Sequence, residues 1–166
     1  MRNFALLFLS IFLALSSSVM AHPHILRVGG RYDIPLTFAM QEGTSFVNSE
    51  RTIFFNFTVE ELLGTQPDLL YQDAKDAFVR SELRKRKSKL PSYQHADTSF
   101  LEDFPYPNIV FTGKYYNKRL GNSVHRSYVF FVDGKMYWMN CVCTRDAYFQ
   151  KNAKDTFDSI FCTFRK

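Results

Sequence analysis

The chain has 166 residues and a formal net charge of +5. Aromatic residues make up 17% of it, which excludes an intrinsically disordered chain, because such chains contain few aromatic residues. The small excess of positive charge is compatible with a soluble protein and does not by itself indicate nucleic-acid binding.

The amino terminus has the pattern of a secretory signal peptide. Arg2 supplies a positive charge, residues 4–15 form an apolar run, and residues 19–21 match a small-x-Ala cleavage site. An uncleaved membrane anchor is the alternative, but the run is shorter than the roughly 20 residues that a spanning helix needs. We therefore expect residues 1–21 to be removed. The mature protein is then exported, periplasmic or secreted, and has no transmembrane segment.

Residues 22–30 are interpreted as a flexible amino terminus of the mature chain, and residues 31–166 as a single domain. After cleavage, the amine and ring of His22 would be able to chelate copper together, so His22 is the candidate metal ligand. Pro23 lacks the N–H through which His24 would complete such a site, and a solvated tail is the competing interpretation. The remaining histidines and the cysteines lack metal-site spacing, so we expect no cofactor.

Strands and turns are predicted next along the chain. Residues 32–38 form a short candidate strand, which Pro35 places at a sheet edge. Residues 43–49 have the composition of a turn. Residues 52–59 alternate in side-chain type, which predicts a strand.

A long helix is predicted from Gly64 to about Lys87. Thr65 can cap its amino terminus, Pro67 is tolerated in its first turn, and the stripe that contains Ala77 and Phe78 should lie on the sheet. The pattern then predicts a strand near 93–97, an irregular loop to 107, a strand over 108–116 and a turn over 117–122.

The stretch from Ser127 to Thr144 predicts a β-hairpin at the centre of the sheet. Two aromatic and β-branched runs flank Asp133-Gly134, a pair that favours a two-residue turn. Both sides of this hairpin are largely apolar, so a layer must cover each of them. The turn sets a register that pairs Val132 with Lys135, Phe130 with Tyr137, Tyr128 with Met139 and Arg126 with Cys141 on one side, and Phe131 with Met136, Val129 with Trp138 and Ser127 with Asn140 on the other.

After Thr144 the apolar spacing becomes helical, with Phe149, Ala153, Phe157 and Ile160 on one stripe. This predicts a closing helix. The elements together predict an α+β fold: an α/β/α sandwich with a central antiparallel sheet of five or six strands and one long helix on each face.

The chain has three cysteines, so at least one stays free or pairs with another chain. Export permits a disulfide between Cys162 and either Cys141 or Cys143. We favour buried thiols that act as small apolar groups. If the closing helix folds back along the strand that precedes it, Cys162 lies about 24 Å from Cys141 and Cys143. A disulfide needs Cα atoms within about 7 Å of each other.

The order of elements resembles the PsbP-like superfamily, which includes the photosystem II extrinsic protein P and the Ran-binding Mog-type proteins. Residues 128–164 are similar to its closing strand, helix and Ser/Thr-Phe ending, and Tyr-Asp-Ile-Pro at 32–35 is similar to its opening motif. The resemblance implies a scaffold that binds partners and has no agreed catalytic site. The chain lacks the long charged extension of the photosynthetic members, which argues against a role in oxygen evolution.

No catalytic motif is present in the sequence. It contains neither a Gly-x-Ser-x-Gly nucleophile motif nor a phosphate-binding glycine loop. Glu102 and Asp103 suggest a carboxylate dyad, but exposed turn residues of this kind are far commoner. Cys141 and Cys143 lie in an aromatic strand and are therefore expected in the core rather than as nucleophiles.

The run from Arg80 to Lys89 is the strongest charge feature. Cations at a helix carboxyl terminus complement the helix dipole, so a solvated helix end is the simple interpretation. The sharper hypothesis is a docking patch for an acidic protein or an anionic envelope component. The candidate partner-binding residues are these cations and two aromatic residues of the following loop: Arg84, Lys85, Arg86, Lys87, Lys89, Phe104 and Tyr106.

We therefore expect an exported, non-catalytic accessory protein that binds a protein or envelope partner. The alternatives are an exported enzyme with a site that no motif marks, and a secreted effector or adhesin. Export and the lack of aromatic residues within the basic run disfavour nucleic acid as the partner.

Overall fold

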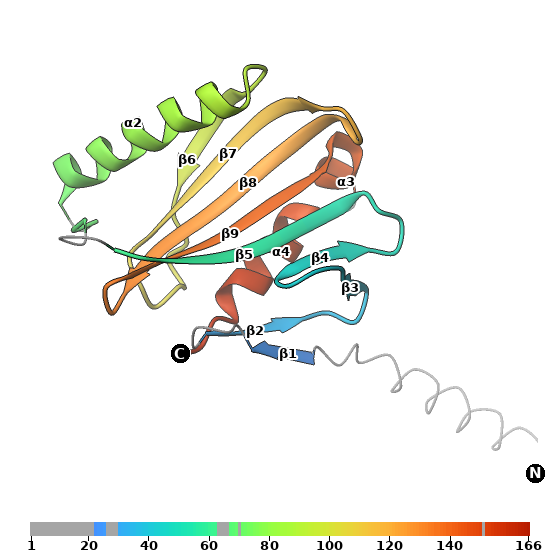
Figure 1. The fold of residues 1–166 in the computed structure, drawn as a ribbon, viewed down its shortest axis with the longest axis horizontal. Coiled ribbons are helices and arrows are strands. Elements are labelled where there is room, and N and C mark those ends of the chain that lie inside the picture. The colour runs from blue at the N-terminus through green and yellow to red at the C-terminus, as the bar shows by residue number, and fades with distance from the viewer. Residues whose placement is uncertain (1–21, 26–29, 63–66, 70, 151) are drawn as a thin grey trace, which may run out of the picture.

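A computed structural model of the chain describes residues 22–25, 30–62, 67–69, 71–150 and 152–166. The predicted signal peptide, residues 1–21, and the predicted helix cap Thr65 lie outside the described residues. In the described part, α2 (Gln72–Lys89) lies against one face of a large sheet and α4 (Ala153–Cys162) against the other (Figure 1).

The fold is α+β and is built on a seven-stranded sheet with the strand order β3-β4-β5-β9-β8-β7-β6. Every neighbouring pair in this sheet is antiparallel. A separate two-stranded sheet is formed by β1 (His22–Ile25) and β2 (Arg31–Ile34). The seven strands are β3 (Phe38–Met40), β4 (Ser45–Asn48), β5 (Ile53–Glu61), β6 (Gln94–Ser99), β7 (Asn108–Asn117), β8 (Gly121–Val132) and β9 (Lys135–Thr144).

The central hairpin formed by β8 and β9 has the predicted register at every predicted pair. Asp133 and Gly134 have φ angles of 50° and 70°, the left-handed values that let a two-residue turn follow the twist of its strands. β8 and β9 lie inside the sheet, between β7 and β5. The prediction of a central hairpin is therefore confirmed.

Alternate side chains of this hairpin enter two different hydrophobic clusters. The cluster under α2 consists of Ile109, Phe111, Val129, Phe131 and Trp138, against which Phe78, Val79 and Leu83 of the helix pack. The opposite cluster is larger and joins Tyr128, Phe130, Tyr137 and Met139 of the hairpin to Phe157, Ile160 and Phe161 of α4. The two apolar faces of the hairpin are thus both removed from water.

The sheet has seven strands, so the prediction of five or six strands is wrong. β4 occupies most of the segment predicted as a turn, and its Phe46 stacks on Phe55 of β5 with ring centroids 5.1 Å apart. Gly43 and Arg51 flank β4 with φ angles of 57° and 56°. Because turns bound this four-residue strand on both sides, the segment resembles one continuous loop in the sequence.

α2 begins at Gln72, later than predicted, and Pro67 lies before the helix. Phe78 faces the sheet as predicted, but Ala77 is exposed. The side of the helix on the sheet is therefore rotated from the predicted stripe and includes the buried residues Glu82 and Arg86.

The predicted closing helix is divided into α3 (Arg145–Gln150) and α4. Asn152 before α4 has a left-handed φ of 52°, a conformation that a right-handed helix cannot contain. Ala153, Phe157 and Ile160 are buried as predicted, whereas Phe149 on α3 is 58% exposed. A long helix is thus present on one face, and two short helices replace the second one.

β2 connects the first described strands to the carboxyl terminus. Arg31 and Arg165 exchange backbone hydrogen bonds of 2.8 and 3.0 Å, and the backbone N–H of Asp33 donates to Thr163 Oγ1 at 2.8 Å. Tyr32 stacks on Phe57 with ring centroids 4.2 Å apart. β1 pairs with β2 and falls in the segment 22–30, for which no strand was predicted.

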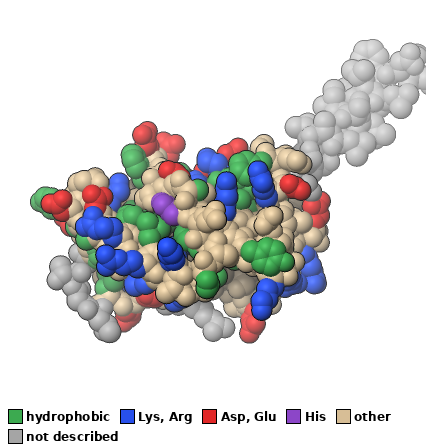
Figure 2. All heavy atoms as spheres, turned by 90° about the horizontal axis from the view of Figure 1, so that it is seen from above, with side chains coloured by type: hydrophobic (Ala, Val, Ile, Leu, Met, Phe, Trp, Pro, Cys, Tyr) green, Lys and Arg blue, Asp and Glu red, His purple; other side chains and the backbone are tan. Residues whose placement is uncertain are grey.

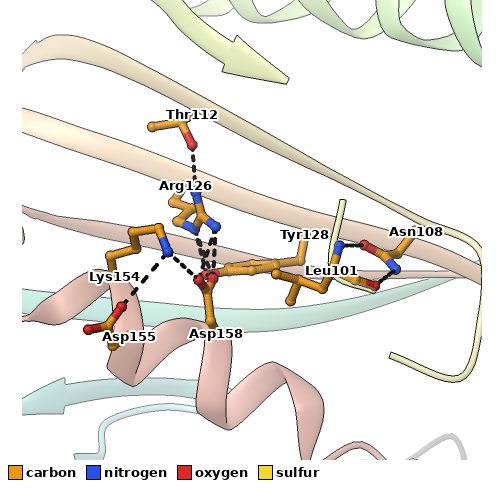
Figure 3. A network of polar contacts seen from close by, with 8 residues as sticks. All are labelled: Leu101, Asn108, Thr112, Arg126, Tyr128, Lys154, Asp155 and Asp158. Atoms are coloured by element: carbon orange, nitrogen blue, oxygen red, sulfur yellow. Dashed lines mark hydrogen bonds and ion pairs between the residues drawn. The ribbon is translucent and has the colours of Figure 1, made fainter. Parts of the chain in front are cut away.

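A buried ion pair fixes α4 to the sheet (Figure 3). Arg126 on β8 donates to Asp158 Oδ1 from Nη2 at 2.8 Å and to Thr112 Oγ1 from Nη1 at 2.8 Å. The Tyr128 hydroxyl and Lys154 Nζ donate to the same carboxylate at 2.5 and 2.9 Å. The pKa of Asp158 is lowered because the hydrogen bond from Tyr128 and the charge of Arg126 outweigh the burial of the carboxyl group, which acts in the opposite direction.

We predict that Asp158→Asn destabilises the fold by about 3 kcal/mol, because it leaves the Arg126 cation buried without a counter-ion. Arg126 is 4% exposed, so water cannot replace the lost carboxylate. Urea unfolding measures the effect. Asp155→Asn on the same helix is the matched control: Asp155 is 72% exposed and its contact with Lys154 is 3.8 Å, so we expect a change below about 0.5 kcal/mol. Equal losses in the two variants would contradict the role given to the buried pair.

Candidate functional site

The carboxyl-terminal half of α2 carries most of the predicted partner-binding cations. Arg84, Lys85, Lys87 and Lys89 are exposed there, as the hypothesis of a docking patch requires. Figure 2 views the side of the molecule that carries α2 and shows Lys and Arg side chains spread over it, with apolar side chains between them. Arg86 differs from its neighbours because it points inward and is buried.

Arg86 is held between the helix and the sheet. It lies four residues after Glu82 and eight after Phe78, so all three occupy the side of α2 that faces β7, β8 and β9. Its guanidinium lies over the ring of Phe111, 4.7 Å from the centroid, and 5.5 Å from the centroid of Trp138. The cation–π contacts with these two rings therefore offset part of the desolvation free energy of the buried guanidinium.

A chain of polar side chains continues from Arg86 across the sheet. Arg86 Nη1 donates to Ser127 Oγ at 3.0 Å and lies 3.0 Å from His125 Nδ1. Because a guanidinium can only donate, Nδ1 must accept, and Nε2 then carries the proton and donates to Ser127 Oγ at 3.1 Å. The Ser127 hydroxyl in turn donates to Asn140 Oδ1 at 2.9 Å on β9.

His125 is neutral in this arrangement. Burial, followed by the positive charge of Arg86, lowers the pKa of His125 from its ordinary value of 6.5 to about 3. Tyr93 packs edge-on against the imidazole with ring centroids 6.2 Å apart. Tyr93 also covers Gly113, where an added Cβ would lie 2.4 Å from the ring, so only glycine allows this approach.

A polar cleft of about 430 Å³ opens beside Arg86, between α2 and the strands β5 and β9. It combines cations, carboxylates, amide or hydroxyl groups and a small apolar wall. The Lys85 ammonium at its edge binds the Glu82 carboxylate at 2.6 Å. The lining residues are Thr58, Glu60, Glu82, Lys85, Arg86, Lys89, Met136, Trp138 and Asn140.

The two predicted aromatic contact residues lie elsewhere, near the loop before β7. Phe104 is 5% exposed and stacks on Phe161 with ring centroids 4.3 Å apart, so it belongs to the core and not to an exposed contact surface. Tyr106 is half-buried against Phe130. The structure therefore does not bring these residues together with the cations of α2 in one site. Phe100, which the sequence analysis did not select, is the exposed aromatic residue of this loop.

The candidate carboxylates and cysteines do not form a site in the described structure. Glu102 and Asp103 are exposed loop residues. All three cysteines are free; Cys141 and Cys143 are buried, and Cys162 is exposed rather than buried. Burial raises the pKa of the Cys143 thiol to about 12, which fits a core thiol and not a nucleophile.

In the described part of the chain, no group of three or more His, Cys, Asp or Glu side chains is placed to hold a metal ion. Within the same residues, no helix combines the length and apolar character needed to cross a membrane. His22, the candidate copper ligand, is the first residue of β1.

The inner part of the site was not predicted from the sequence; it consists of His125, Ser127, Trp138 and Asn140. The predicted register already places the last three on one face of the hairpin, and His125 follows on the same face by alternation. Three polar residues in a row on a face that is otherwise aromatic were the available signal. Arg86 had no such signal, because its neighbours in the sequence are exposed cations.

We predict that His125 makes the fold sensitive to acid. The unfolded chain takes up a proton on this residue below about pH 6.5 and the folded chain does not until about pH 3, so stability is lost as the pH falls between these values. From pH 7 to 4.5 the loss from this group is about 3 kcal/mol. Urea unfolding at the two pH values should show that His125→Gln removes most of it. His95→Gln, on the exposed strand β6, is the comparison: burial also lowers the pKa of His95, but this residue is less buried, so we expect a smaller effect. An equal effect in both variants would refute the prediction.

No protein-family model matches the chain, and no curated protein sequence matches it. Solved structures do. Cyanobacterial PsbP (CyanoP) from Synechocystis sp. PCC 6803 has a TM-score of 0.56 and 13% identity, with 90% of this chain and 95% of that chain covered. LpqN of Mycobacterium tuberculosis, involved in cell envelope biogenesis, has a TM-score of 0.58 and 10% identity, with 89% and 86% covered.

The Ran-binding protein Mog1p of Saccharomyces cerevisiae has a TM-score of 0.51 and 11% identity, with 89% of this chain and 96% of that chain covered. Identities this low show the fold and nothing beyond it. The shared fold spans nearly the whole of each protein, as the resemblance in residues 32–35 and 128–164 implied. The chain has the PsbP/Mog-like fold.

Proposed function

We propose that this chain is an exported, non-catalytic accessory protein that binds a partner protein of the cell envelope. The contact surface is the basic cleft, defined as the polar cleft between α2 and the strands β5 and β9 together with the exposed cations of the carboxyl-terminal half of α2. The observation that carries the proposal is the meeting of Lys85, Arg86 and Lys89 at one cleft.

The positive charge is concentrated on one part of one helix. Between residues 80 and 89 the only acidic side chain is Glu82, and Lys85 already binds it. Exposed cations in such a cluster attract an acidic partner and speed its encounter. This favours a partner with an acidic segment.

A protein fits this surface better than an anionic membrane does. The cleft is recessed and contains Glu60 and Glu82 next to its cations, and carboxylates at the contact would repel anionic headgroups. Trp138 and Met136 offer an apolar wall, and aromatic residues of this kind are enriched at protein interfaces.

The comparisons support the proposal only at the level of the scaffold. Mog1p is named as a Ran-binding protein, and LpqN is named for cell envelope biogenesis, so the fold serves proteins with such roles. Export follows from the predicted signal peptide in residues 1–21.

Co-purification from an envelope extract of the source organism tests the proposal. We predict that the mature protein recovers a specific partner and that Lys85→Glu with Lys89→Glu reduces the recovery at least about tenfold, because two attractive charges become repulsive. Lys118→Glu with Lys166→Glu, an equal charge change at two exposed sites away from α2, is the control and should leave recovery unchanged. Binding to anionic vesicles instead of a protein, or turnover in a substrate screen without any recovered partner, would overturn the proposal.

A further inference from the structure

Arg86 is a buried cation that the described structure leaves without a counter-ion. It is 9% exposed, and among the described residues it forms no ion pair, since the nearby Glu82 carboxylate is bound by Lys85. Its Nε is buried and has no hydrogen-bond partner there. Burial lowers the pKa of Arg86, which shows that the surroundings disfavour its charge, although Tyr93 and Glu82 act in the opposite direction.

A second buried polar atom without a partner lies beside it. The Tyr93 hydroxyl has no partner with full hydrogen-bond geometry among the described residues. It lies beside Arg86, and this contact raises the pKa of Arg86 and lowers the pKa of Tyr93, each against the larger effect of burial. Unpaired buried donors cost free energy, and native proteins keep few of them. Of these two residues Arg86 is the one that lines the cleft, so its unpaired Nε and its uncompensated charge indicate a binding site for an acceptor that the described part of the chain does not itself supply.

We infer that the basic cleft binds the carboxylate of a Glu or Asp side chain from an extended acidic segment of the partner protein, with Arg86 as the residue that receives it. The inference rests on the proposed function and names the chemistry that the cleft recognises. Arg86 Nη1 is already engaged by Ser127 and His125, so the remaining N–H groups of the guanidinium are those available to the carboxylate.

The composition of the cleft matches a glutamate side chain. Trp138 and Met136 can contact its methylene groups, and Lys85 and Lys89 lie where the rest of an acidic segment would pass. Asn140 and Thr58 offer amide and hydroxyl groups for the backbone of that segment. A cleft of about 430 Å³ holds one or two side chains and not a folded domain, so the ligand enters as an extended segment.

A phosphate group is a poorer match. Glu60 and Glu82 line the same cleft, and their charges repel a dianion more strongly than a single carboxylate. Of the three cations that line the cleft, Arg86 is the buried one, since Lys85 and Lys89 are exposed. A monoanion therefore balances the buried charge without adding an excess of negative charge.

Trp138 makes the inference directly measurable. It is the only tryptophan in the chain, it lines the cleft, and the Arg86 guanidinium lies over its ring. The full mature protein is titrated with the peptide acetyl-Gly-Glu-Glu-Gly-amide at low ionic strength while tryptophan emission is recorded. We expect a saturable change with the Glu peptide and none with the matched Gln peptide. Inorganic phosphate should bind at least about tenfold more weakly than the Glu peptide.

Three variants assign the response to the cleft. Arg86→Met should weaken binding roughly 30-fold or more, because it removes the charge that pairs with the carboxylate. Lys89→Gln, an exposed change at the rim, should weaken it about threefold. Lys118→Gln removes the same charge from an exposed residue between β7 and β8, outside α2 and the cleft, and should have no effect. Circular dichroism and urea unfolding confirm that each variant is folded.

Several outcomes would overturn the inference. These are equal binding of the Glu and Gln peptides, tighter binding of phosphate, equal effects of Lys118→Gln and Lys89→Gln, or full binding by folded Arg86→Met. The result is separable from the proposed function. Recovery of a partner that survives Arg86→Met refutes only the carboxylate site, whereas a specific peptide response without any recovered protein partner refutes only the accessory role.

Discussion

The fold depends on one constraint: the β8–β9 hairpin is apolar on both sides, and both sides must be kept from water. Phe131, Val129 and Trp138 point to one face, and Tyr128, Phe130 and Tyr137 to the other. An antiparallel sheet often leaves one face to solvent, and this hairpin cannot. The chain meets the constraint by placing α2 after β5 and α3 and α4 after β9, so that a helical segment follows each of two neighbouring strands and covers a different face.

Each face of the sheet buries one arginine, and the two arginines differ in whether an ion pair balances their charge. On the α4 side, Arg126 is paired with Asp158 and hydrogen-bonded to Thr112 and Tyr128, so its charge helps to hold the helix. On the α2 side, Arg86 has aromatic rings, a serine and a neutral histidine, and the nearby Glu82 carboxylate is bound by Lys85. Burying either arginine costs desolvation free energy, but within the described residues only Arg126 regains it through an ion pair. This difference is the reason why we propose that the α2 face uses its charge for binding.

The sequence was sufficient for the parts of the fold that depend on local pattern. Asp133-Gly134 determined the turn, and with it the register of the whole hairpin and the division of its side chains between two faces. It was insufficient where a tertiary contact overrides local preference. Phe46 makes β4 a strand because it packs on Phe55, and the left-handed conformation of Asn152 divides a helix whose spacing continues across the break. Arg86 is the sharpest case, since only the rotation of α2 on the sheet distinguishes it from Lys85 and Lys87.

The cleft itself follows from the dimensions of the elements. Strands lie about 4.8 Å apart, so a seven-stranded sheet is roughly 29 Å wide between its outer strands, whereas a helix with its side chains covers only about 10 Å. One helix therefore cannot cover this face, and a strip of β5 and β9 beside α2 remains accessible. The chain places Thr58 and Asn140 on that strip, where apolar side chains would stay exposed to water. The widths of the sheet and the helix thus create the cleft, and the inward position of Arg86 places a positive charge in it.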